Sequence, residues 1–252
     1  MNVSFHDYSL FFKFMEEYES VAYNEINRKD SLIVQLEEMT ELNDQYFFIA
    51  DLLMGKIIFA SERSKMMIGV DPDILNPYHN VEVIHPDELY RNTSGWAKLL
   101  SIANELLLKK KGYSIMSKNM KMRAPSGVYH EILFQCYSFY SQLPHPTVYV
   151  FIALTNIDQI SLKKNGYHYY IGEDMSYFKY PNEMMLEVGI SYTKRELDII
   201  KLIAAGHSSE EIAEELFISL HTVNSHRGNI LKKSNKTHVS DLIIDLKEMG
   251  LI

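Results

Sequence analysis

The sequence contains a single cysteine among its 252 residues, Cys136, so no disulfide can form within the chain. This scarcity fits a reducing compartment, and we expect the protein to lie in the cytoplasm. No apolar run approaches the length of a bilayer span, and no cationic segment followed by an apolar stretch marks a secretion signal. Both absences predict a protein without membrane attachment.

Motifs of catalysis are also missing. The sequence has no glycine-rich phosphate loop, no Gly-x-Ser-x-Gly and no paired-histidine motif, and it lacks the acidic cluster and late lysine of a phospho-receiver domain. A lone imidazole, His85 in a His-Pro-Asp turn, is weak support for haem. We therefore expect no catalytic residue, no metal and no cofactor. An enzyme would need a pocket that gathers Cys136, or His85 with Asp87.

Positive charge is scarce in the chain but concentrated near its end. The formal net charge is −8, yet no acidic residue stands between Glu215 and Asp241. The cations of that interval are Arg227, Lys232, Lys233 and Lys236. A charge run is more often a solvated face. A basic cluster in an acidic protein also places favourable potential where phosphates can be met.

The same part of the chain has the pattern of four short helices joined by tight turns. Thr193 with Glu196 forms a capping box at the start of the first helix, and Gly206 ends it. Ser208 or Ser209 caps the second helix.

A third helix is expected from about Leu220 to Ser234, capped by Ser219, and a fourth opens at Thr237 or Ser240. The core-facing residues of the third helix are expected to be Val223, Ile230 and Leu231. A capped third helix at helix–turn–helix spacing, carrying the cation cluster, favours DNA binding over a merely solvated face.

Residues 191–252 resemble the LuxR-type helix–turn–helix family without a gap. The motifs that carry the resemblance are Thr193-Lys194-Arg195-Glu196, Ile203-Ala204-Ala205-Gly206, Glu211-Ile212-Ala213, Leu216-Phe217-Ile218-Ser219 and Thr222-Val223-Asn224-Ser225-His226-Arg227-Gly228-Asn229-Ile230. The family implies a four-helix domain that binds double-stranded DNA as a dimer. Its third helix reads bases and its fourth pairs two subunits.

Carried over by position, the resemblance assigns two kinds of DNA contact. On the base-facing surface it places Asn224, Ser225 and Gly228. Near phosphates it places Ser209, Thr222, Arg227 and Lys232. The Asn224 amide suits a bidentate contact to adenine. Two departures point to modest affinity, because Glu210 stands where the family often has lysine and Gly228 offers no side chain.

The fourth helix carries an apolar stripe that a small domain cannot cover twice. The stripe consists of Val239, Leu242, Ile243, Leu246 and Met249. We expect part of it to face a second copy of the chain. The homodimer seam is placed at Leu242, Leu246 and Met249.

Residues 1–43 are helical in pattern, and residues 44–160 change to short β-rich runs. The N-terminal apolar stripes include Phe5, Tyr8, Phe11, Phe12, Met15 and Tyr18, then Leu32, Ile33, Leu36, Met39 and Leu42. We expect them to pack on the following domain or on a second subunit. The expected strands are Tyr46 to Asp51, Lys56 to Ala60, Tyr113 to Arg123, Val128 to Ser141 and Thr147 to Thr155.

With helices expected between the second and third strands, the order is β-β-α-α-β-β-β, which resembles the PAS sensor fold. The local matches are FFIADLLMGKIIFASERSKMMIGVDPD, Ile84-His85-Pro86-Asp87-Glu88-Leu89 and Leu154-Thr155-Asn156-Ile157-Asp158. The resemblance implies a five-stranded antiparallel sheet with helices on one face, used for sensing ligands or for dimerising. The fold class is therefore α+β, with a PAS-like domain before an all-α helix–turn–helix domain. The strand aromatics could line a pocket, although such residues more often form core.

Residues 161–190 connect the two parts and are too aromatic for a flexible linker. We expect this connector to dock on one domain or between both. The combined prediction is a transcription regulator whose partners are double-stranded DNA, a second copy and a small molecule in the PAS-like domain. The alternative is a ligand-free adaptor whose DNA binding depends on another protein.

Overall fold

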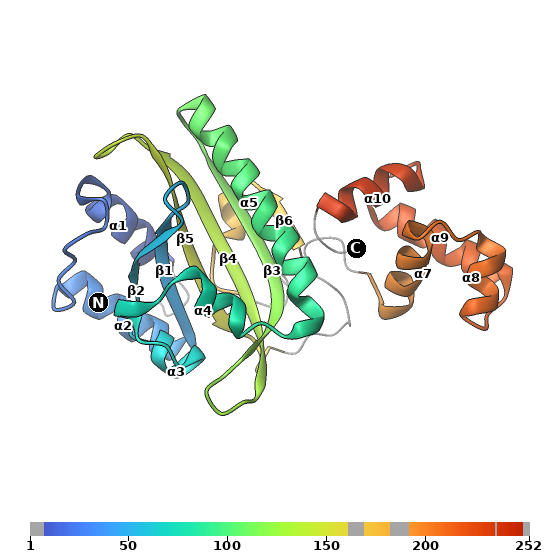
Figure 1. Ribbon diagram of the computed structural model, residues 1–252, viewed down its shortest axis with the longest axis horizontal. Helices are drawn as coiled ribbons and strands as arrows, with labels where there is room; N and C mark the ends of the chain where they lie inside the picture. Colours follow the sequence, from blue (N-terminus) through green and yellow to red (C-terminus); the bar gives the residue numbers. More distant parts are fainter. Residues whose placement is uncertain (1–7, 161–168, 182–191, 235, 249–252) are drawn as a thin grey trace.

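The computed structural model describes residues 8–160, 169–181, 192–234 and 236–248. Its first helices are α1 (Ser9–Tyr18), α2 (Ser31–Leu42), α3 (Ser64–Ile68), α4 (Pro77–Glu82) and α5 (Leu89–Lys109). Its strands are β1 (Gln45–Asp51), β2 (Lys56–Ala60), β3 (Tyr113–Arg123), β4 (Tyr129–Ser141), β5 (Thr147–Asn156) and β6 (Tyr169–Gly172). The C-terminal helices are α7 (Lys194–Ala204), α8 (Ser209–Glu215), α9 (Leu220–Ser234) and α10 (Val239–Glu248). This order confirms the α+β class (Figure 1).

The strands form one antiparallel sheet in the order β2-β1-β5-β4-β3-β6. All five expected strands are present, and their ends lie within one residue of the prediction. A sixth strand, β6, comes from the connector and pairs with β3. It was missed because it is only 4 residues long and lies in a segment interpreted as a docking connector.

Side chains alternate between the two faces of the sheet, and both faces are buried. On one face, called here the aromatic face, about half of the buried side chains are aromatic, including Phe47 and Phe151. On the other, the aliphatic face, aliphatic and methionine side chains predominate, including Met116, Met120 and Ile152. Strands β1 and β5 are covered on both sides and therefore read as unbroken apolar runs.

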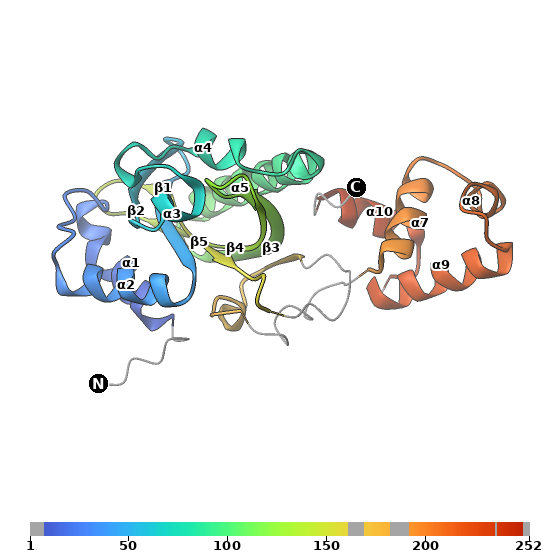
Figure 2. The same cartoon turned by 90° about the horizontal axis from the view of Figure 1, so that it is seen from below.

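The N-terminal helices cover the aromatic face, on the side of the sheet opposite to α4 and α5 (Figure 2). Phe11 and Phe14 of α1 are fully buried, and their rings contact those of Phe47 and Phe151. The prediction that the N-terminal stripes pack on the following domain is confirmed except at Leu42, which is 62% exposed. Helices cover both faces of the sheet rather than one. Phe5 lies outside the described residues.

The described part of the connector docks on the aromatic face. Phe178 is buried there, with its ring against that of Tyr8. The Gln135 side chain donates from Nε2 to the carbonyls of Tyr177 at 3.0 Å and Lys179 at 3.1 Å. Its Oε1 accepts from the Tyr8 hydroxyl at 3.2 Å. Docking on one domain is thereby confirmed for this part of the connector.

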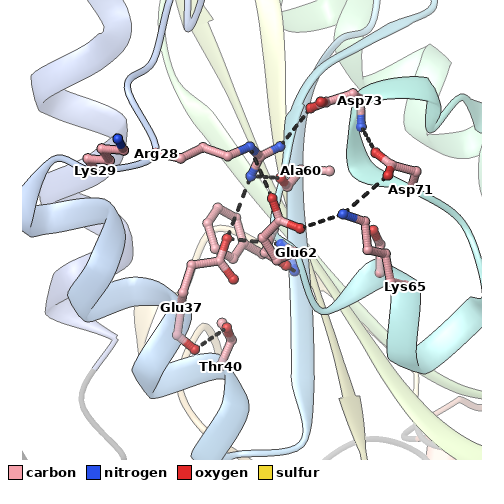
Figure 3. A network of polar contacts seen from close by, with 12 residues as sticks. Arg28, Lys29, Glu37, Thr40, Ala60, Glu62, Lys65, Asp71 and Asp73 are labelled. Carbon is pink, nitrogen blue, oxygen red and sulfur yellow. Dashed lines mark hydrogen bonds and ion pairs between the residues drawn. The ribbon is translucent and has the colours of Figure 1, made fainter.

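An arginine at the β2 edge of the sheet joins the covers of the two faces. Figure 3 shows Arg28, from the loop between α1 and α2, reaching toward acids of several elements. Its guanidinium donates to the carbonyl of Ala60 at 3.1 Å and pairs with Glu62 at 3.3 Å and Asp73 at 3.0 Å. Glu37 of α2 lies 3.8 Å from the same guanidinium and accepts from the backbone N–H of Glu62 at 2.9 Å. The loop is thus tied to both α2 and the start of α3.

The C-terminal helices enclose a small core of their own, to which all four contribute. Its buried residues are Tyr192, Leu197, Ile199, Ile200, Ile212, Ala213, Val223, Ile230, Leu242 and Leu246. The expected capping box of Thr193 and Glu196 opens α7, and Gly206 follows that helix with φ +93°. Helix α10 begins at Val239, between the two predicted start positions.

Candidate nucleic-acid interface and sensor cavity

The start of α9 is fixed by Ser219, as predicted. The Ser219 Oγ accepts from the backbone N–H of Thr222 at 3.0 Å, and the two hydroxyl oxygens are 2.8 Å apart. The backbone N–H of Val223 donates to the Ser219 carbonyl at 3.1 Å. These bonds satisfy donors that the first turn of a helix would otherwise leave open, so α9 begins in a defined direction directly after the turn from α8.

One side of α9 is buried and the opposite side is open. Val223, Ile230 and Ser234 face the core at helical spacing. The predicted site residues exposed on the opposite side are Asn224, Ser225, Gly228 and Lys232. Thr222 and Arg227 are half-buried. The structure therefore brings the predicted base-facing residues together on one exposed surface.

The predicted base-facing residues on the exposed side of α9 carry small side chains or none. The Ser225 hydroxyl donates to the backbone carbonyl of His221 at 2.9 Å, which leaves its lone pairs for another donor. A Cβ added at Gly228 would meet nothing within 4 Å, so packing does not require glycine there. His221 is also exposed, and it lies three and four residues before Asn224 and Ser225. His221 was not among the residues predicted for this surface, although its spacing from Asn224 and Ser225 indicates that it lies there.

Lys233 of the predicted cation cluster forms an ion pair within its own domain. Its Nζ lies 2.6 Å from Oε2 of Glu196, whose side chain is only 5% exposed. Burial alone would raise the pKa of Glu196, but the hydrogen bonds from Lys233 and Thr193 hold this pKa below its ordinary value. Lys233 thus secures the start of α7, and Arg227 and Lys232 are the cations of α9 left beside its exposed side.

The structure shows which of two serines caps the start of α8, a choice that the sequence left open. Ser208 is the cap, since its Oγ accepts from the backbone N–H of Glu211 at 3.2 Å. Ser209 stands in the first turn and is half-buried. Glu210, next to it, is exposed and adds negative charge near the proposed phosphate contact. A contact from Ser209 to phosphate stays a prediction.

The proposed dimer seam lies on α10. Leu242 and Leu246 are 1% and 0% exposed because both pack in the core of their own domain. Neither side chain is therefore open to a second subunit in this fold. Ile244, on another side of the helix, is 57% exposed. Met249 lies outside the described residues.

A cavity of about 300 Å³ opens at one end of the sheet domain, between α3 and the ends of several strands. Its apolar lining consists of Met66, Met67, Ile68, Met122, Ala124 and Ile132. Its polar lining consists of Asp44, Tyr46, Arg63, His130 and Asn156. Tyr46, Ile68, Met122 and Ile132 also belong to the core of the aliphatic face, so the cavity extends from that face.

The polar groups at the cavity form a connected series. Asp44 pairs with the Arg63 guanidinium and accepts from Nδ2 of Asn156 at 2.8 Å. Oδ1 of Asn156 accepts from the backbone N–H of Asp158 at 3.0 Å. The Asp158 carboxylate lies 2.6 Å from Nδ1 of His130. The Nε of Arg63 is buried and has no hydrogen-bond partner.

The two other residues considered in the sequence have ordinary structural surroundings. Nδ1 of His85 accepts from the backbone N–H of Asp87 at 3.3 Å and caps the short 3-10 turn Pro86–Glu88. Cys136 is buried in β4, and burial raises the pKa of its thiol to about 12. Among the residues that the structure describes, no three His, Cys, Asp or Glu side chains gather as a metal site requires. Over the same residues, no helix combines the length and apolarity needed to cross a bilayer.

Comparison with known proteins matches the C-terminal part to a family. Residues 191–245 fit the model described as bacterial regulatory proteins, luxR family. Transcriptional regulatory protein LiaR of Bacillus subtilis (strain 168) is 58% identical over 43 residues, 17% of this chain and 20% of that protein. Oxygen regulatory protein NreC of Staphylococcus carnosus (strain TM300) is 45% identical over 51 residues, 20% of this chain and 24% of that protein. The chain spans at most a quarter of the length of these relatives, so the similarity concerns one domain.

Two solved structures cover more of the chain at lower similarity. The VqmA dimer of Vibrio cholerae, without its target DNA, aligns with 86% of this chain and 88% of that one at 14% identity and a TM-score of 0.36. VqmA bound to DPO aligns with 82% and 89% at 15% identity and a TM-score of 0.35. Such low scores do not establish a common arrangement of the whole chain. The family match and the capped helices agree on the C-terminal part: the chain carries there a helix–turn–helix domain of the luxR family of bacterial regulatory proteins.

Proposed function

We propose that the protein regulates transcription by binding double-stranded DNA through α9. The exposed side of that helix carries the proposal. It presents the Asn224 amide beside Gly228, with Arg227 and Lys232 nearby, in a chain whose net charge is otherwise negative. An amide of this kind pairs with adenine in the major groove, and the cations neutralise phosphates. The luxR-family match supports this role, and no enzymatic activity is proposed.

We further propose that two copies bind together in the cytoplasm and that the PAS-like domain senses a small molecule or holds the dimer. The cavity beside α3 supports the sensing role. The exposed Ile244 favours a pairing surface on α10 beside, rather than at, the buried Leu242 and Leu246. A two-fold dimer would bind a roughly palindromic site with two half-sites.

Selection of DNA from a random-sequence library by the full-length protein tests the DNA-binding role. On the selected sequence, Arg227→Ala should weaken binding and lower the slope of log affinity against log salt by about one. Asn224→Ala should cost about 1–3 kcal/mol and relax preference at one position. Lys56→Ala, which removes an exposed cation from the sheet domain, is the control and should leave the salt slope and the sequence preference unchanged.

Two results would contradict the assignment. Enrichment of no sequence by the purified protein would remove the direct DNA-binding role. If a cell extract then restored selection, the adaptor that depends on another protein would replace it. Unchanged salt slope and sequence preference in both α9 variants would mean that another surface binds the DNA.

A further inference from the structure

We infer that the cavity beside α3 binds an uncharged, mainly apolar small molecule whose accepting oxygen is received by Arg63. This inference rests on the proposed sensing role of the PAS-like domain and names the chemistry of its ligand. The cavity volume of about 300 Å³ lies at the small end of ligand sites, which favours a molecule of metabolite size over a peptide.

The apolar part of the ligand would lie against three methionines. Met66 and Met67 come from α3, and Met122 comes from the end of β3. Ile68 and Ile132 complete this surface. Unbranched thioether side chains adapt their shape to a guest and contact aromatic rings favourably. A flat or short-chain apolar body is therefore the shape that this lining accommodates best.

The polar part of the ligand is defined by an unused donor. Arg63 pairs with Asp44 through Nη2, but its Nε is buried without an acceptor. A buried donor of a charged group left without a partner costs more free energy than an ordinary missing hydrogen bond. A carbonyl, amide or hydroxyl oxygen of the ligand would supply this acceptor. Since Arg63 lines the cavity, the oxygen belongs on the side of the ligand next to α3.

The charges around the cavity disfavour an ionic ligand. The positive charge of Arg63 is balanced by Asp44, and Asp158 holds His130 through Nδ1. Because the ion pair of Arg63 with Asp44 is already formed, a carboxylate or phosphate would have to displace Asp44 to gain that cation. A cation would compete with Arg63 and Asn156 for a carboxylate that both already use. An uncharged acceptor avoids both conflicts.

Four molecules of similar shape separate these possibilities. Benzamide is uncharged with an accepting oxygen, toluene lacks the oxygen, benzoate is an anion and benzamidine is a cation. Each is titrated into full-length protein with ¹³C-methyl-labelled methionine, and the methionine methyl resonances are followed by NMR. Benzamide should shift Met66, Met67 and Met122 saturably and bind more tightly than the other three. Met54 is the internal control and its resonance should not shift. It is 70% exposed, as Met66 is 69% exposed, but it does not line the cavity.

Two variants test the role of Arg63. Arg63→Lys keeps a cation for Asp44 but has no Nε–H, so benzamide should bind roughly tenfold more weakly while toluene is unaffected. Lys65→Met removes a cation two residues away that pairs with Glu62 and Asp71 outside the cavity, and it should change neither affinity.

The inference is overturned if benzoate binds as tightly as benzamide. It is equally overturned if Met54 shifts with Met66, or if Arg63→Lys leaves the preference for benzamide over toluene unchanged. Binding of the selected DNA is measured on the same samples. Intact DNA binding with no probe bound would remove this ligand site and leave the DNA-binding role standing. Loss of DNA binding with benzamide still bound would remove the DNA-binding role and leave the ligand site standing.

Discussion

The two faces of the sheet share the same strands but are closed in different ways. The aromatic face is filled by rings from α1, β1, β5 and the connector, and a hydrogen-bond series crosses it. Gln45 donates to the Tyr8 hydroxyl at 2.7 Å, and Tyr8 donates to Gln135, which holds the connector. The aliphatic face is covered by the short helices α3 and α4 and by α5, and it opens into a cavity.

The difference indicates a division of labour within one layer of strands. Rings that interlock at short distances resist rearrangement, because a vacated ring leaves a void that its neighbours cannot fill. Methionines and small residues around a cavity accept a change of contents at little cost. We therefore expect the aromatic face to set stability and connector position, and the aliphatic face to tolerate substitution at the cavity.

The largest contrast is expected from truncating one side chain on each face. Phe11→Ala should lower the free energy of unfolding of the sheet domain by about 3–5 kcal/mol, because the buried ring fills space against Phe47 and Phe151. Met66→Ala, at the cavity and 69% exposed, should change it by less than about 0.5 kcal/mol. Urea unfolding followed by fluorescence of Trp96, the single tryptophan of the chain, measures both. Equal losses would refute the contrast between the faces.

The next largest effect concerns the link between the aromatic face and the connector. Gln135→Leu should cost about 2 kcal/mol, because the Tyr8 hydroxyl and the carbonyls of Tyr177 and Lys179 lose their partner. Hydrogen exchange at residues 169–181 should speed up at the same time.

The matched control is Gln35→Leu on the exposed side of α2, which should alter neither quantity. Unchanged exchange at the connector in the Gln135→Leu variant would show that Phe178 and strand β6 hold the connector without the glutamine.

A smaller effect is expected where the covers of the two faces meet. Arg28→Met should lower stability by about 1 kcal/mol, since exposed ion pairs contribute little and only part of this guanidinium is buried. The loss should shrink at high salt, because the lost attractions to Glu37, Glu62 and Asp73 are screened there. Lys29→Met is the control, because Lys29 is exposed and no ion pair reaches it in Figure 3. Equal effects of the two variants would mean that the network does not join the covers.

The features that sequence predicted best depend on neighbours close in the chain. The capping box of Thr193 and Glu196 and the cap at Ser219 span only three residues, so local hydrogen-bonding chemistry decides them. The strands were predicted by β-rich runs between turn residues, which are also local signals. The assembly of these strands into one antiparallel sheet followed only from the resemblance to the PAS fold.

The features that sequence missed depend on residues far apart in the chain. Lys233 was counted with the cation cluster, because the sequence does not reveal its ion pair with Glu196, which stands 37 positions away. The seam at Leu242 and Leu246 followed from an apolar stripe, which does not say whether the same domain covers it. The residues that line the cavity are spread along the sequence from Asp44 to Asn156, so no single segment predicted the cavity.

The smallest expected effect tests how deep the opening of the aliphatic face reaches. Cys136 lies on this face in the middle of β4 and is fully buried. Burial raises the pKa of its thiol to about 12, so the reactive thiolate is negligible at pH 8. A disulfide reagent such as DTNB should therefore leave the native protein unmodified and react at once after unfolding in urea. Met54→Cys in a Cys136→Ala background gives an exposed thiol as the positive control.

The thiol experiment shows whether the aliphatic face opens only at one end of the sheet or along its whole length. Protection of Cys136 would confine the opening to the end of the sheet beside α3, with the middle of the aliphatic face as closed as the aromatic face. Rapid modification of the native protein would mean that the aliphatic face opens along its length. The ligand space would then extend past the residues that line the cavity, and Arg63 would mark only its entrance. Since the cavity lining ends at Tyr46, Met122 and Ile132 and does not include Cys136, the first result is expected.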